Sequence, residues 1–481
     1  MMDIRTRLPA LSLFRVLILL GCTVNGSTVV AETALQHHKI TLIKDATLII
    51  TMDPNLGEGP LGLIRHGSIT IEDDIIRQLG DSGDHVDEVI DASGMIVLPG
   101  FVDAHNHLWQ TLIRGCGIDK ELPGWLDECM WPVSQSLDES DTYAFVRLST
   151  VDLINTGVTT TLDWSIASNE AMIKGNIRAL EDSGLRFVFA YFDSNCTIED
   201  CSKAKSTRDA IIELKRKSID PNPLAGLQTA SHPIPLLEPS MRNMVQLAKE
   251  LSITFNVHLY EHKDSPHMQL NGMELLEKSG AFSGQLMINH AVHLSKEDIR
   301  KLAQHDVRVV HNPLSNMRLA SGVMPLPEIH LAGLTVGLGL DGGANDTSDV
   351  FSLMRAAVGL QRAKYMEANV FPTVPDVLRL ATMGGAKALG LEKIIGSLTP
   401  GKQADIIIID PHQVNFAPDW NLVNQIVFNA RPVNVSYVLV AGRLLKKEGR
   451  LLVDSKKYVE DAETAIKRFR RRYVPAQLKS N

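Results

Sequence analysis

The sequence predicts an α/β fold: a (β/α)8 barrel, or TIM barrel, with a small β-sandwich domain built from both ends of the chain. Strand-like segments lie at both ends, and between them short apolar runs alternate with amphipathic helical patterns. The length of 481 residues suits one large barrel with a satellite domain better than a single small core.

The strand-rich segments at the two ends have apolar runs bounded by glycine, aspartate and proline, as is typical of β-strands. They are Ile40–Thr51, Gly67–Leu79, Val86–Val97, Ala404–Asp410 and Val435–Ala441, the last followed by a turn at Gly442. We expect one sandwich with an N-terminal part at 32–97 and a C-terminal part at 395–452. A C-terminal helix and tail are expected at 453–481.

The middle of the chain, 98–394, is expected to form the barrel. Its eight apolar runs are Ile96–His107, Val158–Trp164, Leu185–Phe192, Leu224–Thr229, Ile253–Glu261, Leu286–Val292, Val307–His311 and Leu334–Asp341. Helix starts are indicated by Ser240 before Met241–Leu251 and by the capping-box pattern of Ser295 with Asp298. Eight such units are typical of a barrel of about 250 residues. The alternative, an open doubly wound sheet, lacks its glycine-rich nucleotide turn here.

The first 31 residues have the pattern of an export signal. Arg5 and Arg7 precede an apolar stretch, Leu8–Leu20, which is too short to span a bilayer. The segment Leu19–Cys22 resembles a lipoprotein cleavage box and would leave a lipid anchor at its cysteine. Cleavage after Ala31 would instead give a periplasmic or secreted protein. The alternative is a disordered extension on a cytoplasmic protein.

The composition is that of an ordinary soluble enzyme, with 44% hydrophobic and 22% charged residues and a net charge of −8. The short basic stretch Lys467–Arg472 is predicted to be a solvated helix face, so we expect no nucleic-acid partner. Among the five cysteines, Cys196 and Cys201 are close enough to pair in an oxidising compartment. Cys116 and Cys129 could equally be buried thiols, and no spacing fits a zinc finger.

Ionisable side chains fall at the carboxyl ends of predicted barrel strands, where the active sites of such barrels form. His105 and His107 lie two residues apart, so both imidazoles point to one face of the first strand. His258, His290 and Asp341 end the fifth, sixth and eighth strands. Such nitrogen and oxygen donors, with room for a water, fit a catalytic zinc site, although iron or manganese would also fit. The expected metal ligands are His105, His107, His258 and Asp341.

The remaining polar groups suggest a division of roles. Glu261 is expected to shuttle protons, with helix capping as the alternative. His290 is expected to polarise the attacked carbon or to position the water, and His293 is a competing candidate. Asp341 is expected to bind the metal and accept the proton of the water; the alternative is a simple turn residue. Because a metal lowers the pKa of bound water from 15.7 to about 7, the pattern predicts hydrolysis by a metal-bound hydroxide.

Together these motifs resemble the amidohydrolase superfamily, and most closely its mononuclear branch of aminoheterocycle deaminases and triazine hydrolases. The resemblance covers about Ile40 to Leu452. It rests on Pro99–His107, His258–Glu261, His290–Leu294, His311–Met317 and Leu340–Gly342. It implies metal binding and proton handling by the residues named above, a small-molecule substrate and a homo-oligomer. The predicted fourth strand has no lysine, which binuclear members use to bridge two ions, so we expect one metal.

The resemblance implies hydrolytic deamination of an aminoheterocycle, and several segments are similar to guanine-type and 8-oxoguanine-type deaminases. These segments are His107–Leu112, Gly124–Leu126 and Ser315–Gly322. The resemblance implies that Gln110 faces the purine. The alternative is that its side-chain amide stabilises a loop. His232 resembles a substrate-facing histidine of nucleoside deaminases, with a loop histidine as the alternative. The glutamate and arginines of those nucleoside enzymes are replaced here by Val133–Ser134 and Phe189–Phe192.

Two other functions are compatible with the sequence. The same fold could hydrolyse a cyclic amide, an acyclic amide or a carbon–chlorine bond, and the product would discriminate: ammonia, a ring-opened acid or chloride. A catalytically silent binding protein is less favoured, because every expected ligand is present.

Overall fold

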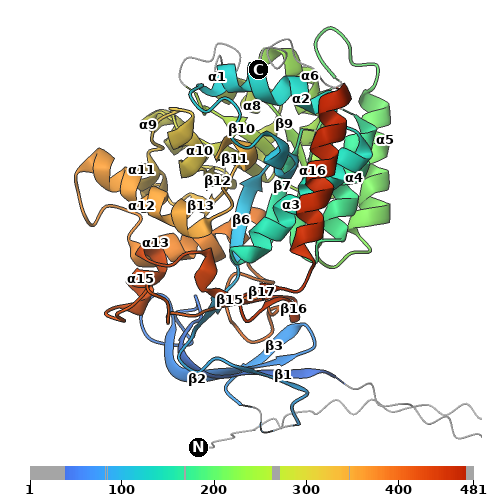
Figure 1. Cartoon of the computed structure of the whole chain (residues 1–481). Helices are drawn as coiled ribbons and strands as arrows, with labels where there is room; N and C mark the ends of the chain where they lie inside the picture. Colours follow the sequence, from blue (N-terminus) through green and yellow to red (C-terminus); the bar gives the residue numbers. More distant parts are fainter. Residues whose placement is uncertain are drawn as a thin grey trace, which may run out of the picture. The chain divides into compact units, whose positions relative to one another are not determined.

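The structure, a computed structural model, describes residues 38–81, 83, 85–166, 169–194, 196–262, 271–345 and 347–472. The predicted export signal, with Cys22, lies outside the described residues, as do the last nine residues. Two sheets organise the described chain, one of eight strands and one of nine (Figure 1).

The eight-stranded sheet is parallel throughout and closes into the predicted barrel. Its strands, in spatial and sequence order, are β6 (Phe101–Asn106), β7 (Val158–Ser165), β8 (Arg186–Phe192), β9 (Ala225–Ser231), β10 (Phe255–Leu259), β11 (Leu286–His290), β12 (Val307–His311) and β13 (Thr335–Leu338). The first and last strands are joined beyond the end of β13, where the Asp341 backbone N–H donates to the His105 carbonyl at 2.9 Å. The barrel prediction is therefore confirmed.

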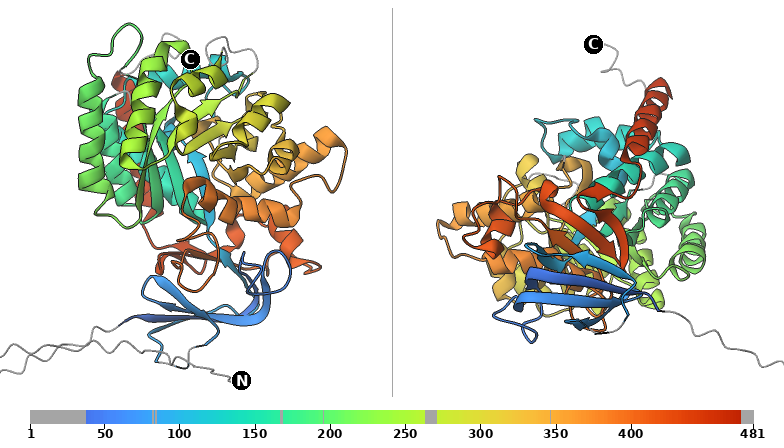
Figure 2. Two further views of the ribbon diagram at one scale, coloured as in Figure 1. Left: turned by 180° about the vertical axis from the view of Figure 1, so that it is seen from behind. Right: turned by 60° about the horizontal axis from the view of Figure 1, so that its bottom comes forward.

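Helices follow the strands and cover the outside of the barrel (Figures 1 and 2). The main ones are α3 (Glu139–Asn155), α4 (Glu170–Glu181), α5 (Ala204–Leu214), α6 (Glu238–Leu251), α8 (Gly272–Lys278), α9 (Lys296–Leu302), α10 (Pro313–Arg318), α11 (Leu326–Leu331), α12 (Val350–Tyr365), α13 (Val374–Arg379) and α14 (Gly385–Leu389). The capping box of Ser295 and Asp298 is present at the start of α9. Helix α6, however, begins before Ser240, because Pro239 favours the first helical turn and the Ser240 hydroxyl donates to the Asp193 carbonyl instead.

The nine-stranded sheet combines both ends of the chain, as predicted (Figure 2). It contains β1 (Ile40–Ile50), β2 (Leu63–Glu72), β3 (Ile75–Leu79), β4 (Glu88–Asp91), β5 (Ile96–Pro99), β14 (Ile406–Ile409), β15 (Val435–Val440), β16 (Arg443–Lys447) and β17 (Arg450–Leu451). Strand β5 joins the two halves, since it pairs with β1 on one side and with β14 on the other. Buried side chains such as Ile69, Ile406 and Leu439 give this sheet a core of its own.

The run Ile96–His107, expected as one barrel strand, is divided between the two sheets. Its first part is β5, and its second part, β6, begins the barrel after Gly100. A Cβ at Gly100 would lie 2.2 Å from the Thr159 side chain, so only glycine fits where the chain passes from one sheet to the other. A continuous apolar run conceals such a change of sheet, because both parts are equally buried.

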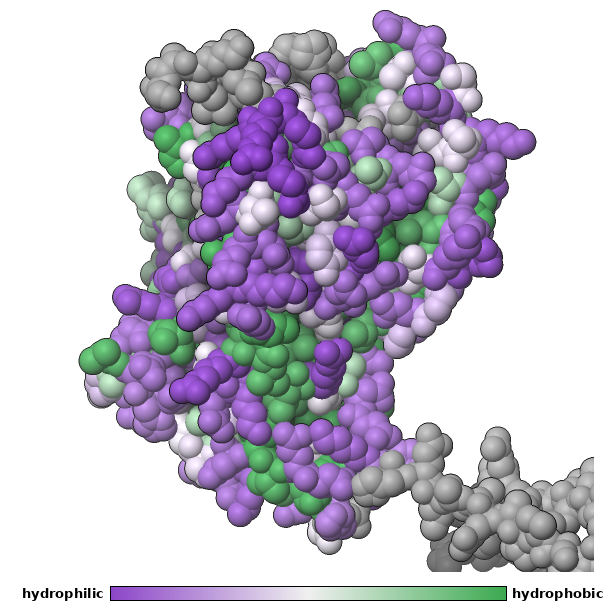
Figure 3. All heavy atoms as spheres, turned by 45° about the vertical axis from the view of Figure 1, so that its right-hand side comes forward, coloured by the Kyte–Doolittle hydropathy of each residue, from purple (hydrophilic) through white to green (hydrophobic). Residues whose placement is uncertain are grey.

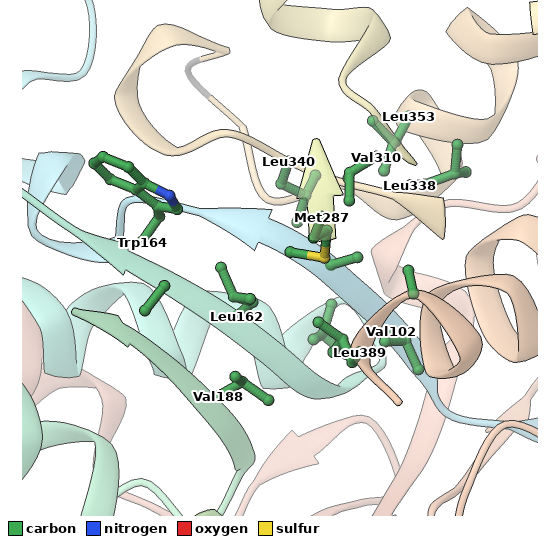
Figure 4. Packing of buried hydrophobic residues seen from close by; sticks show 14 of the residues in the cluster. Val102, Leu162, Trp164, Val188, Met287, Val310, Leu338, Leu340, Leu353 and Leu389 are labelled. Carbon is green, nitrogen blue, oxygen red and sulfur yellow. The ribbon is translucent and has the colours of Figure 1, made fainter. Parts of the chain in front are cut away.

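The barrel core is one continuous apolar cluster, part of which is shown in Figure 4. Val102 of β6, Leu162 of β7, Met287 of β11 and Leu338 of β13 are all buried in it, and Leu389 of α14 packs nearby. Val102 lies on the opposite face of β6 from Asp103 and His105 and packs against Gly385 of α14, so this cluster includes the layer between the strands and the helices that cover them.

The predicted C-terminal helix is α16 (Ser455–Arg472), and its basic residues are engaged with α3. Arg468 donates to the buried Asp141 carboxylate at 3.0 Å, and Arg472 pairs with Asp138 and Asp141. Part of the predicted solvated face is therefore a docking contact.

The surface in Figure 3 is largely hydrophilic. No helix among the described residues is long and apolar enough to cross a membrane.

A buried ion pair connects the barrel with the nine-stranded sheet. The Arg186 guanidinium, at the start of β8, donates twice to Asp405, at 3.2 and 3.1 Å, and both side chains are at most 3% exposed. The same carboxylate accepts the Ala441 backbone N–H at 2.9 Å. This bidentate pair fixes the direction in which the two sheets meet.

We predict that Arg186→Met lowers the free energy of unfolding by about 3–5 kcal/mol, because it leaves the Asp405 carboxylate buried without its partner. Equilibrium denaturation monitored by circular dichroism would measure the loss. The exposed pair Arg216 and Glu213 offers a matched control, and Arg216→Met should cause no comparable change. A loss for Arg186→Met as small as that of the control would contradict this role.

Candidate active site

All four predicted metal ligands converge at the carboxyl end of the barrel. His105 lies in β6, His258 lies in β10, and His107 and Asp341 follow β6 and β13. One nitrogen or oxygen atom from each of them lies within 4.8 Å of the other three. All four side chains are buried.

The distances within this group are short. Asp341 Oδ1 lies 3.1 Å from His105 Nε2 and 3.4 Å from His107 Nε2. The Nε2 atoms of His107 and His258 are 3.3 Å apart. The other ring nitrogen of His107, Nδ1, is paired with the Trp164 carbonyl at 2.6 Å, which orients Nε2 toward the group.

This arrangement fits one divalent cation. Three imidazole nitrogens and a carboxylate oxygen, gathered away from water, form a donor set typical of catalytic zinc. Burial lowers the pKa of His105 to about 4 and holds the pKa of His258 well below its usual value, so these imidazoles are neutral and free to bind metal. Burial alone would raise the pKa of Asp341, but His290 and hydrogen bonds from His105 and His107 outweigh it and keep it well below normal.

Glu261 and His290 form a second group around the same aspartate. His290 Nε2 lies 3.5 Å from Glu261 Oε2 and 4.0 Å from Asp341 Oδ2. Burial, and then the Asp341 charge, raise the pKa of Glu261 well above normal, so this carboxyl favours its protonated form. Burial also lowers the pKa of His290 to about 3. A neutral acid and an ionised carboxylate thus lie side by side, an arrangement suited to proton transfer.

Two asparagines orient His290. The Nδ2 groups of Asn316 and Asn312 donate to His290 Nδ1 at 3.0 and 3.3 Å. An Nδ1 that accepts these bonds leaves the proton of the neutral ring on Nε2, which faces Glu261 and Asp341.

Two of these residues have a backbone conformation that residues other than glycine usually avoid. His290 has φ of 70° and Asp341 has φ of 60°, both in the left-handed region. Each lies where its strand ends, and each is held by the surrounding core. Non-glycine residues in this region concentrate at functional sites.

A cavity of about 290 Å³ opens above the group. Its walls are mainly apolar, and its lining comprises Leu122, Pro123, Trp125, Leu126, Met130, Trp131, Ile166, Ile234, Leu319 and Ala344 with the polar residues His107, Gln110, Asp127, His232, His258, Glu261, His290 and Asp341. This volume is close to the lower limit of about 300 Å³ for small-molecule sites. The cavity therefore suits a small ring compound.

The structure places the tentative substrate residues at this cavity. Gln110 lines it, while its Oε1 accepts the Gly343 N–H at 3.2 Å, so this amide also supports the loop. His232 lines it too, with its ring 5.0 Å from those of Trp164 and His258. His293 lies apart from the group, and its Nε2 bonds the Ser321 carbonyl at 2.7 Å.

Sequence reasoning missed several supporting residues. Asp103 is buried, and its carboxylate accepts hydrogen bonds from the Leu340 N–H at 2.9 Å, the Asn106 side chain at 2.6 Å and the Thr161 hydroxyl at 2.9 Å. Its position two residues before His105, on the same face of the strand, was a usable signal. Asn312 and Asn316, which orient His290, belong to the segment His311–Met317 that carries part of the family resemblance. Nothing in the sequence indicated that their partner is His290.

Comparison with known proteins agrees with this geometry. The amidohydrolase family model matches residues 96–445. A 5'-deoxyadenosine deaminase of Methanothermobacter thermautotrophicus is 33% identical over 417 residues, covering 84% of this chain and 95% of the relative. A 5-methylthioadenosine/S-adenosylhomocysteine deaminase of Syntrophomonas wolfei is 31% identical over 398 residues, covering 80% and 90%. An adenosine deaminase from Xanthomonas campestris, solved with bound zinc, has the same fold, with a TM-score of 0.79, 24% identity and coverage of 90% and 98%.

A (β/α)8 barrel with a His₃Asp group at its carboxyl edge defines a metal-dependent hydrolase. The chain belongs to the amidohydrolase family, which confirms the resemblance seen in its motifs. It is an enzyme of the deaminase type, acting on carbon–nitrogen bonds other than peptide bonds.

We predict that Asp103→Asn weakens zinc binding by about 10- to 100-fold, the usual effect of losing a group that supports metal ligands. An amide cannot accept all three donors that now bond this carboxylate, so the strand that carries His105 would shift. Competition with a chromogenic chelator would measure the affinity. Thr161→Val, which removes only one of these donors, is the matched control; equal zinc affinity in Asp103→Asn and wild type would refute the role.

Proposed function

We propose that this enzyme uses a single zinc ion to deaminate a 6-aminopurine ring, releasing ammonia. The observation that carries the proposal is the meeting of Glu261, His290 and Asp341 at the floor of the apolar cavity. In this proposal His105, His107, His258 and Asp341 hold the ion. Zinc is supported by the three-imidazole donor set and by the zinc in a structural neighbour.

When bound, such an ion supplies a nucleophilic water at neutral pH. Asp341, ionised and 3.1 Å from His105, takes the proton from that water. Glu261, kept protonated by its burial, gives its proton to the ring nitrogen next to the attacked carbon. The Nε2 proton of His290 stabilises the developing negative charge. The amine then leaves with the proton that Asp341 received, and the proton of the added hydroxyl returns to Glu261 as the carbonyl of the product forms.

The walls of the cavity support the substrate class. The flat rings of Trp125 and Trp131 and the apolar side chain of Leu319 line the cavity, where a ring compound could pack against them. Polar contacts are available from Gln110 and His232, which line the same cavity. The relatives named above are deaminases of 5'-deoxyadenosine and of 5-methylthioadenosine and S-adenosylhomocysteine, which are adenine nucleosides without a free 5'-hydroxyl. We propose Gln110 and His232 as residues that contact the substrate.

We further propose that the enzyme is exported, and then periplasmic, secreted or lipid-anchored, and that it forms a homo-oligomer. Two disulfides, Cys116–Cys129 and Cys196–Cys201, support export, because disulfides persist in oxidising compartments. Fractionation of expressing cells, with mass spectrometry of the mature N-terminus, would test export. A full-length chain in the cytoplasm would contradict it.

Glu261→Gln should keep its metal and lose about 10²–10⁴-fold in rate, the usual share of general acid–base catalysis. Ammonia release and metal content, measured on one preparation, test this. Glu274→Gln, on the exposed side of α8, is the control and should keep the wild-type rate. Undiminished turnover by Glu261→Gln would remove Glu261 from the mechanism.

The function itself is tested by metal content and product analysis on the full chain, with aminopurines, pterins, pyrimidines and triazines as substrates. We expect about one metal per chain and ammonia from 6-aminopurines. Metal without ammonia would favour the amide-hydrolase or dechlorinase alternatives. Absence of metal, even after reconstitution with zinc, would contradict the proposal.

A further inference from the structure

One wall of the cavity comes from a single segment, residues 114–131, which a disulfide spans. Cys116 and Cys129 are bonded, with 6.0 Å between their Cα atoms. Between these cysteines or directly after them lie Leu122, Trp125 and Trp131, all of which line the cavity. The sequence left these two cysteines open as buried thiols; the structure pairs them.

The second half of this segment is helical, and its first half is not. The helices α1 (Leu122–Trp125) and α2 (Trp131–Ser134), with the π-helical turn η2 (Leu126–Met130) between them, follow one another without a break. A helical stretch of this length is still marginal alone, because isolated helices shorter than about 12–15 residues are marginal in water. None of residues 107–138, all of which the structure describes, belongs to a strand.

Packing and polar contacts also hold the segment. Leu122, Trp125 and Met130 are buried in the main apolar cluster, and Arg114 donates to Asp152 at 2.8 Å. The ion pair of Lys120 with Glu128, at 2.6 Å, is largely exposed and therefore contributes little. Arg318 donates to the Cys116 carbonyl at 2.8 Å, which fixes one end. Trp125 and Cys129 are buried, so the covalent bond joins the apolar side of the wall to that fixed end.

We infer that the Cys116–Cys129 disulfide is a positioning element of the substrate site, which keeps the wall of Leu122, Trp125 and Trp131 in place. The inference rests on the proposed deaminase function. A wall that must be ordered by the substrate weakens binding, because ordering a loop opposes association. The candidate metal ligands lie on barrel strands or directly after them, outside this segment, so we expect the metal to stay bound when the disulfide opens.

Opening is a two-electron reduction. A small dithiol transfers two electrons and two protons to the sulfur–sulfur bond, leaves two cysteine thiols and becomes a disulfide itself. Substrate affinity would then depend on the redox state of the surroundings, and the enzyme would bind substrate best where thiols are oxidised.

The first test compares two double variants. In C116S/C129S we expect KM to rise about tenfold or more, with kcat and metal content within about twofold of wild type. C196S/C201S is the matched control: it also removes a disulfide, but from residues that do not line the cavity, and it should keep the wild-type KM. An unchanged KM in C116S/C129S, or an equal rise in both variants, would overturn the inference.

A second measurement does not need turnover. Folded C196S/C201S protein is treated with a dithiol, and hydrogen exchange is followed by mass spectrometry, which keeps the test valid if C116S/C129S fails to fold. We expect exchange to accelerate in residues 114–131 while the barrel strands stay protected; unchanged protection of this segment would overturn the inference. If the oxidised enzyme releases no ammonia from any substrate, the proposed function fails, and this exchange result still decides whether the disulfide orders the wall.

Discussion

The carboxylate of Asp103 is the contact on which the site depends. Asp103 belongs to β6, the first barrel strand, and its carboxylate accepts the backbone N–H of Leu340, which follows β13, the last barrel strand. These residues are separated by 237 positions, so this bond, together with the bond from the Asp341 N–H to the His105 carbonyl, joins the first and last strands of the barrel. Closure in turn brings His105 within 3.1 Å of Asp341. Without it, ligands from the two strands could not share an ion.

Burial then divides the ionisable groups into different protonation states. The imidazoles of His105 and His258 are neutral because burial lowers their pKa values, and Glu261 keeps its proton because burial raises its pKa. Asp341 is ionised because its neighbours donate to it. One buried pocket thus holds both a proton donor and a proton acceptor, and the difference between them comes from their neighbours, His290 and the hydrogen-bonding histidines, rather than from residue type.

The sequence predicts the barrel and the metal group well, because both depend on local pattern. The two-residue spacing of His105 and His107 specifies a shared face, and apolar runs specify the strands. It does not predict the division at Gly100, since one strand-like run covers both β5 and β6 and both are buried. It does not predict the pairing of Cys116 with Cys129 either, since that pairing depends on how a non-repetitive segment folds. The role of Asn316 likewise requires knowing which side chain lies opposite.

The place of β5 in its sheet has a consequence for synthesis. Its partner β14 follows about 300 residues later, which corresponds to roughly 15–60 s of translation at 5–20 residues per second. For that interval the edge of β5 that later pairs with β14 has no strand beside it, and the side chains of β5 are apolar. An open apolar edge is a template for wrong pairing between chains. This four-residue strand must therefore be kept from pairing with other chains until β14 has been made.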